Sequence, residues 1–331
     1  MTVQLAQPVV MPSPVKESTS KVAFQCLRCA ANIGHVQGRQ EVIVCPRCSW
    51  DMPHENGIWK ALLPERTDYF SSFVNNYESI RAAEGRGSNH SDYYLQLPYK
   101  DISGRNQGQW AIRSRTFRHI EHRILPNLFP GTSTQLWILD LGAGNGWMSY
   151  RLALRGHLPV AVDLLTNNQD GLGAASHYEN HLPVSFPRVQ AELDHLPFVK
   201  NQFDLVIFNA SFHYSEGYER TLTEALRCTR NGGAVIIADT AWYSNDASGQ
   251  AMLRERKTVF TNRYGTASDA IHSLEYLTDE RLQALEKSLG IRWQVDAPFY
   301  GIAWSLRPLQ ARLRGKREPS RFRIYTARKS R

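Results

Sequence analysis

Short apolar runs alternate with longer segments of mixed polarity from about residue 136 to the end of the chain. Seven of these runs are rich in leucine, β-branched and aromatic residues, which is the pattern of strands. The predicted strands cover residues 136–142, 158–164, 186–193, 203–210, 233–239, 292–298 and 321–329. Helical patterns occupy 146–156 and 217–233, and a helix-like insert at 301–315 separates the last two strands. Strands that alternate with helices predict an α/β fold, with a mostly parallel sheet that helices cover on both faces.

The apolar spacing between residues 65 and 135 is helical instead. One predicted helix, within 68–85, gathers its apolar residues on one face; these are Tyr69, Phe70, Phe73, Val74, Tyr77 and Ile80. A second, within 110–131, turns Ile112, Phe117, Ile120 and Ile124 inward, and Pro126 should end or kink it. The long polar stretch between them contains Tyr93, Tyr94 and Tyr99. It predicts either a lid over a ligand or a packed aromatic cluster under the N-terminal segment.

The first 20 residues lack the basic start and the continuous apolar stretch of a signal peptide, so we expect a disordered leader at 1–20. No run of 18 apolar residues is present, and we therefore expect no membrane span. The 331 residues, 42% of them hydrophobic, can fill the core of a globular protein with about two domains. A cytoplasmic location follows by default.

The basic charge of the chain is concentrated at one end. The net charge is +8, and residues 307–331 contain ten of the 39 Lys and Arg residues with one acid, Glu318. The rest of the chain is therefore close to neutral. A basic segment of this kind either attracts RNA, an anionic substrate or an acidic partner, or forms a solvated face.

Four of the five cysteines have the spacing of a zinc ribbon. They form two C-x-x-C pairs, Cys26 with Cys29 and Cys45 with Cys48, separated by 15 residues. Each pair presents two thiolates from a tight turn, and two turns complete a tetrahedral shell around Zn²⁺. A closed shell leaves no open coordination position, so the predicted zinc ion is structural. The fifth cysteine, Cys228, is predicted to be a small buried residue and not a nucleophile.

The stretch ILDLGAGNGW, residues 138–147, places three glycines directly after a predicted strand. Ligands of open α/β sheets bind beyond the carboxyl ends of the strands. Gly142, Gly144 and Gly146 would let the backbone turn sharply and approach such a ligand. Asp163 ends the next strand, where a carboxylate can accept hydrogen bonds from both hydroxyls of a ribose.

The spacing of the glycines distinguishes between nucleoside cofactors. The dinucleotide fingerprint is G-x-G-x-x-G, whereas this chain has G-x-G-x-G, with Trp147 where the last glycine of the fingerprint would fall. S-adenosylmethionine has no phosphate and carries a sulfonium and an amino-acid tail. Asp140, which precedes the glycines, suits that cationic end. The pattern favours S-adenosylmethionine over a dinucleotide.

The order of motifs resembles the class I S-adenosylmethionine-dependent methyltransferases, in particular the type 11 or ubiquinone-biosynthesis-like group. Residues 138–147 are similar to the glycine-rich first motif of that family, and 160–165 to its ribose-binding strand end. Residues 190–214 resemble its acid-x-acid-x-Leu-Pro-Phe segment with the fourth strand, and 224–239 resemble the following helix, Gly-Gly turn and fifth strand. The resemblance implies a Rossmann-like sheet with an antiparallel last strand.

The resemblance also implies roles and a division of the chain. Glu192, which stands where the family usually has aspartate, and Leu193 are expected to contact the adenine, and Asn209 to contact the cofactor. The expected organisation is a leader at 1–20, a zinc ribbon at 21–64, a helical and loop cap at 65–135, and a methyltransferase domain at 136–331.

Methyl transfer from a sulfonium is a direct displacement that depends on alignment and on exclusion of water. The expected catalytic residues are His213 and Tyr214, which follow the fourth strand with Phe212, and Asp239, which ends the fifth strand before Trp242 and Tyr243. His213 either accepts a proton from the acceptor or packs against the cofactor. Asp239 either takes part in catalysis or caps a helix.

Three functions remain open for such a chain. The first is methylation of a small molecule, such as a secondary metabolite, a quinone or a lipid-linked intermediate, which the type 11 resemblance favours. The second is methylation of an rRNA or tRNA base, with the ribbon and the basic tail in RNA binding. The third is a non-catalytic adaptor that binds through the ribbon, against which the intact glycine motif argues.

Overall fold

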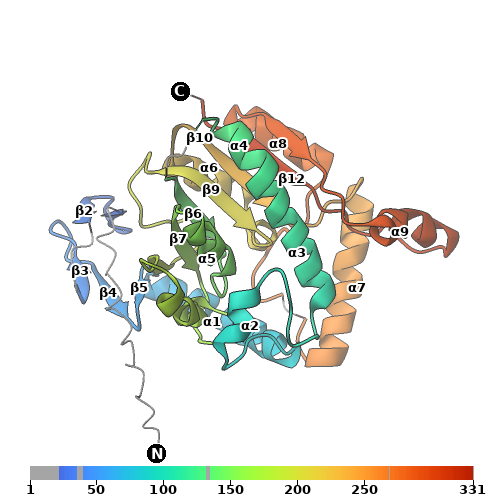
Figure 1. Ribbon diagram of the computed structural model, residues 1–331, viewed down its shortest axis with the longest axis horizontal. Helices are drawn as coiled ribbons and strands as arrows, with labels where there is room; N and C mark the ends of the chain where they lie inside the picture. The colour runs from blue at the N-terminus through green and yellow to red at the C-terminus, as the bar shows by residue number, and fades with distance from the viewer. Residues whose placement is uncertain (1–21, 36–39, 132–134, 268, 331) are drawn as a thin grey trace, which may run out of the picture.

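One ten-stranded sheet organises the chain in the computed structural model, which describes residues 22–35, 40–131, 135–267 and 269–330. The expected leader at 1–20 lies outside these residues. The strand order is β11-β12-β10-β9-β6-β7-β8-β5-β4-β3. The seven strands of the C-terminal part are β6 (Trp137–Leu141), β7 (Leu158–Asp163), β8 (Arg188–Gln190), β9 (Phe203–Asn209), β10 (Thr229–Ala238), β11 (Trp293–Asp296) and β12 (Ile324–Arg328). The predicted strands are thus present, most of them with shorter bounds (Figure 1).

The direction of the strands agrees with the expected methyltransferase sheet. Strands β8, β7, β6, β9 and β10 run parallel to one another. Strand β12 is antiparallel to β10 and to β11, with Ile236 opposite Thr326 and Val295 opposite Tyr325. The prediction of a Rossmann-like, mostly parallel sheet with an antiparallel last strand is confirmed.

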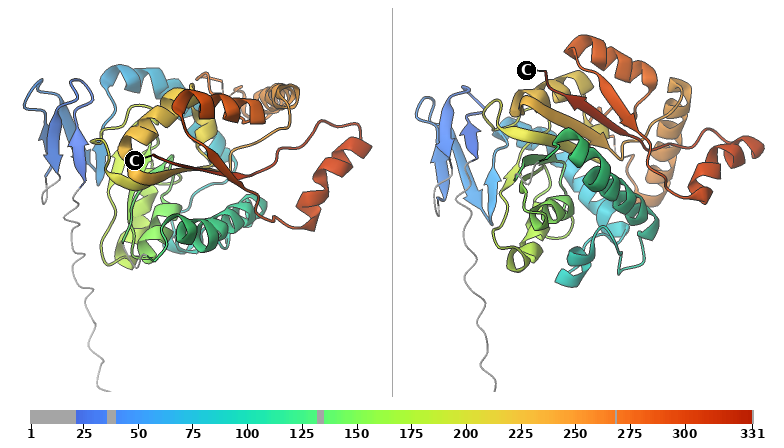
Figure 2. Two further views of the ribbon diagram at one scale, coloured as in Figure 1. Left: turned by 90° about the horizontal axis from the view of Figure 1, so that it is seen from above. Right: turned by 45° about the horizontal axis from the view of Figure 1, so that its top comes forward.

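Helices cover both faces of this sheet (Figure 2). They are α1 (Pro64–Ala83), α2 (Ser91–Gln96), α3 (Gln107–His119), a π-helical turn η1 (Ile120–Ile124), α4 (Leu125–Leu128), α5 (Trp147–Leu154), the 3₁₀ segments η2 (Leu172–His181) and η3 (Phe212–Tyr214), α6 (Tyr218–Cys228), α7 (Asp246–Tyr264), α8 (Asp279–Leu289) and α9 (Ile302–Leu313). Alternate residues of the central strands enter two separate apolar layers. Leu139 and Val206 pack with α6 and α8, whereas Ile138 and Leu205 pack with α3 and α5.

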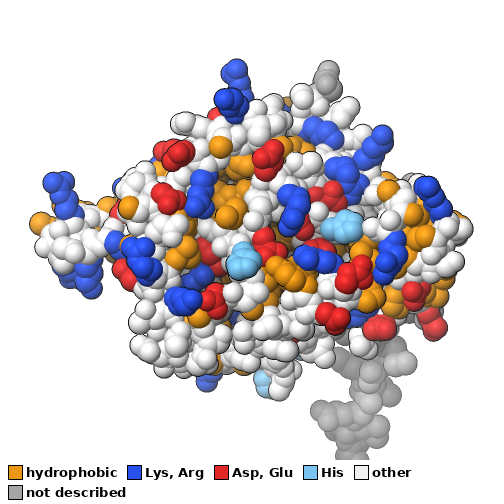
Figure 3. Space-filling model, turned by 180° about the vertical axis from the view of Figure 1, so that it is seen from behind, with side chains coloured by type: hydrophobic (Ala, Val, Ile, Leu, Met, Phe, Trp, Pro, Cys, Tyr) orange, Lys and Arg blue, Asp and Glu red, His pale blue; other side chains and the backbone are white. Residues whose placement is uncertain are grey.

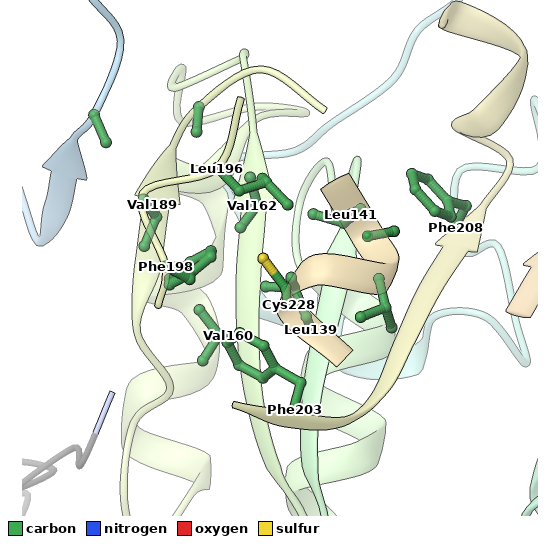
Figure 4. Packing of buried hydrophobic residues seen from close by; sticks show 14 of the residues in the cluster. Leu139, Leu141, Val160, Val162, Val189, Leu196, Phe198, Phe203, Phe208 and Cys228 are labelled. Carbon is green, nitrogen blue, oxygen red and sulfur yellow. The ribbon is translucent and has the colours of Figure 1, made fainter. Parts of the chain in front are cut away.

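The layer under α6 contains the fifth cysteine. Cys228 is fully buried, and it lies among Leu139, Val162 and Phe198 (Figure 4). Burial raises the pKa of its thiol to about 12. A thiol that stays protonated at neutral pH is no nucleophile, so this supports the prediction of a small packing residue.

The second predicted helix does not end at Pro126, which was expected either to end it or to kink it. Instead of ending there, the helical chain continues from α3 through η1 into α4, which ends at Leu128. Proline has no N–H group and its ring disturbs the carbonyl four residues earlier. The wider π-helical turn directly before Leu125 accommodates this without ending the helix.

The N-terminal strands extend the same sheet. Strands β1 (Ala23–Gln25) and β2 (Asn32–His35) form a small antiparallel pair, and β3 (Val42–Val44), β4 (Asp51–Glu55) and β5 (Ile58–Lys60) form a meander. The two-residue loop Asn56-Gly57 connects β4 to β5, and both of its residues have positive φ, as a tight hairpin requires. Strand β5 then runs parallel to β8, with Trp59 opposite Val189. The cysteine-bearing segment therefore covers what would otherwise be an open sheet edge.

Candidate functional site

Three glycines of left-handed backbone form the turn between β6 and α5. The φ angles are 74° at Gly142, 55° at Gly144 and 76° at Gly146. The amides of Gly142 and Ala143 both donate to the carbonyl of Val162, at 2.8 and 2.9 Å, which fixes the turn against β7. A Cβ atom on Gly142 would lie 2.2 Å from the Cβ of Ser211. Glycine is therefore required at this position by both conformation and space.

Replacing Gly142 by alanine is expected to lower the free energy of unfolding substantially. The left-handed backbone costs an alanine about 1–2 kcal/mol, and overpacking against Ser211 costs about 1–3 kcal/mol more. Gly156→Ala is the matched control, because Gly156 has a φ of 83° but its Cβ would meet nothing within 4 Å. Denaturant unfolding measures both variants. Equal losses in the two would contradict a close approach at Gly142.

Two carboxylates predicted for the cofactor face a cavity at this turn. The Oδ2 atom of Asp163 accepts from the amide of Gly144 at 2.8 Å, and its Oδ1 atom accepts from the amide of Leu165 at 2.8 Å. These bonds hold the carboxylate rigidly and leave lone pairs for ligand hydroxyls. Asp140 is 1% exposed and accepts from the hydroxyl of Ser149 at 2.8 Å. Burial raises the pKa of Asp140 to about 7 and that of Asp163 to about 6.

Most of the other predicted cofactor residues line the same cavity. Gly142, Gly144, Leu193 and Asn209 are all part of its wall. The Oδ1 atom of Asn209 is buried and has no hydrogen-bond partner among the described residues, so it remains available to a donor on a ligand. Gly146 lies one turn further on and caps α5 instead. Residues that lie far apart along the chain are therefore brought together beside the glycine turn.

Glu192 is engaged elsewhere. Its carboxylate is 5% exposed and accepts from the guanidinium of Arg66, with a shortest distance of 2.7 Å. Both residues line a separate surface hollow, and Glu192 is not part of the wall of the cavity beside the glycines. Leu193 is the member of the pair that reaches that wall. The adenine contact expected of Glu192 remains a prediction that this arrangement does not support.

Helices from residues 65–135 close the cavity. None of the residues that they contribute was predicted from the sequence to belong to the cofactor site. Phe73, Tyr77 and Arg81 of α1 and Arg113 of α3 line its wall. Arg81 is fixed by Asp170, with 2.6 Å between Nε and Oδ2. Arg113 makes no hydrogen bond or ion pair with any described residue, and its guanidinium lies 4.8 Å from the ring of Trp110. A partly buried cation without an anionic partner is a candidate to bind a ligand anion.

The tyrosines of the loop are not part of this cover. Tyr93 and Tyr94 of α2 are buried, and the hydroxyl of Tyr94 donates to the carbonyl of Gln169 at 2.8 Å. Tyr94 also packs edge-on against Tyr178 of η2, and Tyr99 is 38% exposed. Of the two alternatives, these contacts favour a packed aromatic cluster and not a lid. The cluster packs against η2, however, and not against the N-terminal segment as expected.

A second cavity, here called the acceptor chamber, adjoins the first. The two share Tyr77, Arg81, Arg113, Ala210 and Tyr214 as a common wall. The three predicted catalytic residues, His213, Tyr214 and Asp239, all line the acceptor chamber. Tyr243 lines it as well, whereas the buried Trp242 donates from Nε1 to Asp279 and Phe212 stacks on Tyr218.

The aromatic ring of Tyr214 forms part of the wall between the two cavities. Its ring meets those of Phe73 and Tyr77 edge-on, with centroids 6.0 and 5.6 Å apart. Burial raises the pKa of its hydroxyl well above the usual value. The phenol therefore stays protonated, and its ring shapes the passage.

Three residues that line the acceptor chamber have a buried atom without a hydrogen-bond partner among the described residues: Nη1 of Arg86, Nδ1 of His213 and Oδ2 of Asp239. Burial lowers the pKa of His213 to about 4, so its imidazole is neutral and only weakly basic at neutral pH. Burial raises the pKa of Asp239 to about 6. A carboxylate with this pKa is mostly ionised at neutral pH and is the stronger base of the two.

The carboxylate of Asp239 is held in place from behind. Its Oδ1 atom accepts from the hydroxyl of Thr116 at 2.6 Å, and that hydroxyl lies 2.8 Å from the hydroxyl of Tyr300. Because Thr116 donates its proton to Asp239, Tyr300 must donate to Thr116. Asp239 also has a φ of 51°, an unusual conformation that clusters at functional sites. Asp239 lines the chamber, and its Oδ2 atom forms no hydrogen bond with a described residue.

The four cysteines of the N-terminal segment converge. Their sulfur atoms all lie within 4.8 Å of one another, with 3.4 Å between Cys26 and Cys48 and 3.5 Å between Cys29 and Cys45. Tetrahedral Zn²⁺ with bonds of about 2.3 Å requires sulfur atoms about 3.8 Å apart. The residues fit a four-thiolate zinc ion. None of the four cysteines lines the cavity at the glycine turn, which agrees with a structural role for the ion.

The comparisons with known proteins agree with this site. Residues 139–237, from β6 to β10, match the profile of a family described as Methyltransferase domain. The matched segment contains the glycine turn, Asp163 and Asn209. Residues 139–237 thus carry a methyltransferase domain, in agreement with the class I S-adenosylmethionine-dependent methyltransferase expected from the sequence. The cavity beside the glycine turn is therefore called the cofactor cavity from here on.

Curated relatives of this chain include proteins named Malonyl-(acyl-carrier protein) O-methyltransferase. The one from Erwinia pyrifoliae is 28% identical over 180 residues, which are 54% of this chain and 55% of the relative. The one from Hamiltonella defensa is 25% identical over 137 residues, 40% of this chain and 49% of the relative. The chain thus spans about half the length of the curated relatives it matches.

Two further likenesses complete the comparison. A Fatty-acid O-methyltransferase of Mycolicibacterium smegmatis is 31% identical over 102 residues, which are 31% of this chain and 36% of the relative. The crystal structure of a SAM-dependent methyltransferase from Thermotoga maritima superposes with a TM-score of 0.44 and 15% identity, over 80% of this chain and 99% of that one.

Proposed function

We propose that this protein transfers a methyl group from S-adenosylmethionine to a small molecule that carries a weakly acidic O–H or N–H group. The observation that supports this most is the pairing of two cavities across one wall: a cofactor cavity at the glycine turn and an acceptor chamber with a free, ionisable carboxylate. A transfer reaction needs this arrangement, since the two reactants must meet in line.

The cofactor cavity offers a complementary group for each part of the cofactor. Asp163 accepts from the ribose hydroxyls, and Leu193 packs against the adenine. Arg113 provides the counter-charge for the carboxylate of the amino-acid tail, because it has no anionic partner of its own. Burial lowers the pKa of Arg113 to about 10, which leaves it charged at neutral pH. Asp140 lies near the cationic end.

The chemistry of the step is a displacement. When bound, S-adenosylmethionine would supply a methyl group attached to a sulfonium. As the bond between the methyl carbon and sulfur breaks, the rest of the cofactor leaves as a neutral thioether. The acceptor atom forms the new bond with its lone pair, and its proton passes to Oδ2 of Asp239. Thr116 and Tyr300 hold the carboxylate for this role. Tyr214 and Tyr77 line the passage between the cavities and exclude water from it.

The names of the relatives favour small-molecule or lipid-type acceptors over nucleic acid. Part of the charge of the basic tail is engaged within the chain. Arg323 bonds to Asp279, Arg317 bonds to Glu255, and Arg328 and Lys329 donate to backbone carbonyls of neighbouring turns. In the described residues, no helix is long and apolar enough to cross a membrane. A cytoplasmic location remains our expectation.

A labelled-methyl assay tests the proposed function. The zinc-loaded full chain is incubated with S-adenosylmethionine labelled in its methyl group, together with either total RNA or a small-molecule extract. We expect label in the small-molecule fraction and none above background in the RNA. Label that appears in RNA and resists removal of the small molecules would contradict the proposed acceptor class.

A further inference from the structure

Helix α9 projects from the body of the molecule (Figures 1 and 2). Trp304, Arg307, Pro308 and Ala311 are its half-buried positions, and no residue of the helix is fully buried. The ring of Trp304 stacks on Phe322 with 5.4 Å between centroids. The spacing of the four positions places them along one side, so the opposite side faces solvent.

The solvent-facing side is the more apolar of the two. Ile302, Leu306, Leu309 and Leu313 follow one another at intervals of four, three and four residues, which aligns them in a single stripe. Their exposed fractions are 73%, 43%, 56% and 77%, and Phe299, just before the helix, is 69% exposed. A helix normally buries such a stripe in its own core. An apolar stripe turned outward indicates that something else covers it.

The charge around the stripe is of one sign. Residues 297–317 contain five basic residues and no acid. Arg312, Arg314 and Lys316 are exposed and form no ion pair with a described residue, unlike Arg317, which bonds to Glu255. In Figure 3 the projecting lobe carries basic and hydrophobic side chains together. The stripe therefore requires an occupant that is both apolar and negatively charged.

We propose that α9, with Phe299, docks in the plane of an anionic membrane surface. A basic amphipathic helix with leucines on one face inserts that face at the boundary between lipid headgroups and acyl chains, while its cations bind the acidic headgroups. The stripe lies on a protruding element and not in a groove, which suits a flat surface. A second copy of this chain is disfavoured, because pairing the stripes would bring two basic helices together.

The place of α9 in the fold gives this docking a consequence. Arg317, Ser320 and Phe322 follow the helix directly and line the acceptor chamber. A membrane bound at α9 would thus lie beside the mouth of that chamber. The docking itself does not depend on the proposed methyl transfer, and it can be measured by binding alone.

Co-sedimentation with lipid vesicles tests the proposal. The zinc-loaded full chain is mixed with vesicles of phosphatidylcholine alone or of equal parts phosphatidylcholine and phosphatidylglycerol. We expect binding to the mixed vesicles to be at least about tenfold tighter and to weaken with salt. The double variant L306Q/L309Q should bind the mixed vesicles about tenfold more weakly. Val259→Gln is the matched control, since Val259 is 55% exposed on α7; its binding should change by less than about twofold.

Three results would overturn the proposal. One is equal binding to the two kinds of vesicle, or binding to neither. Another is unchanged binding of L306Q/L309Q in a sample whose thermal unfolding matches that of the wild type. The third is a dimer in analytical ultracentrifugation that disappears in the same variant, which would make the stripe a contact between copies. Failure of methyl transfer in the labelled assay leaves the vesicle result unaffected.

Discussion

Replacing Asp239 by asparagine should lower the rate of methyl transfer by about 10²–10³-fold, the usual contribution of a positioned general base. Asparagine can still accept from Thr116 and fits the same space, but it cannot take a proton. The wild-type rate should rise with pH through about 6, because the raised pKa of Asp239 means that its active, ionised form accumulates there. In the asparagine variant this rise should disappear. Initial rates at saturating labelled cofactor, which removes the effect of pH on cofactor binding, measure both effects between pH 5 and pH 8.

Thr116→Val is the matched control for this prediction. The variant removes the hydroxyl that orients Asp239 but keeps the carboxylate, so the rate should fall by about tenfold while the dependence on pH remains. Asp239 is not part of the wall of the cofactor cavity, and both variants should bind S-adenosylmethionine as the wild type does. An asparagine variant that keeps full activity, or that loses activity only through weaker cofactor binding, would contradict the role of Asp239.

Replacing Cys45 by serine should destabilise the whole chain and not only the N-terminal segment. Zinc binding contributes an apparent ~10–16 kcal/mol to the folding free energy of small zinc-binding peptides. We expect the serine variant to lose about 5 kcal/mol of its free energy of unfolding. This loss corresponds to a fall in Tm of about 10–20 °C. The effect should spread because Phe24 stacks on Phe198 and β5 pairs with β8. Calorimetric unfolding and the zinc content by mass spectrometry measure the variant.

Cys228→Ala is the control for the zinc prediction. Cys228 is as deeply buried as Cys45 but lies in the layer under α6 and outside the sulfur cluster. Its replacement should keep one zinc ion per chain and cost only about 1 kcal/mol, the lost packing of a small side chain. A wild-type chain that purifies without zinc, or a serine variant with an unchanged Tm, would contradict the structural zinc site.

The sequence predicted the features that depend on local pattern. The central strands, the glycine turn and the two cysteine pairs each have a short signature, and each is present in the structure. The helices α7 and α8 escaped prediction, even though Asn245 and Thr278 cap their amino ends and Gly265 and Gly290 follow their carboxyl ends. Only one residue of α7, Gly249, is buried. A helix with so little contact has no apolar period to detect.

Other features depended on contacts that no local pattern reports. The apolar face of α1 was predicted correctly except at Tyr69, which is 41% exposed. A face that lines a cavity and one that packs in a core have the same spacing. The roles of Tyr77, Arg81 and Arg113 could not be separated from packing for that reason. Glu192 pairs with Arg66, which lies 126 positions away along the chain. Such pairings arise only once the fold is known.

Titration of the zinc-loaded full chain with S-adenosylmethionine in a calorimeter tests the central claim, that the glycine turn and Asp163 form the binding site of this cofactor. We predict one site per chain, with binding that is tighter at pH 8 than at pH 5.5, because the raised pKa values of Asp140 and Asp163 leave both acids partly protonated at the lower pH. Asp163→Ala should weaken binding by about 100-fold, the effect of losing two hydrogen bonds to a charged group. No heat with S-adenosylmethionine, or an alanine variant that binds as tightly as the wild type, would contradict the claim.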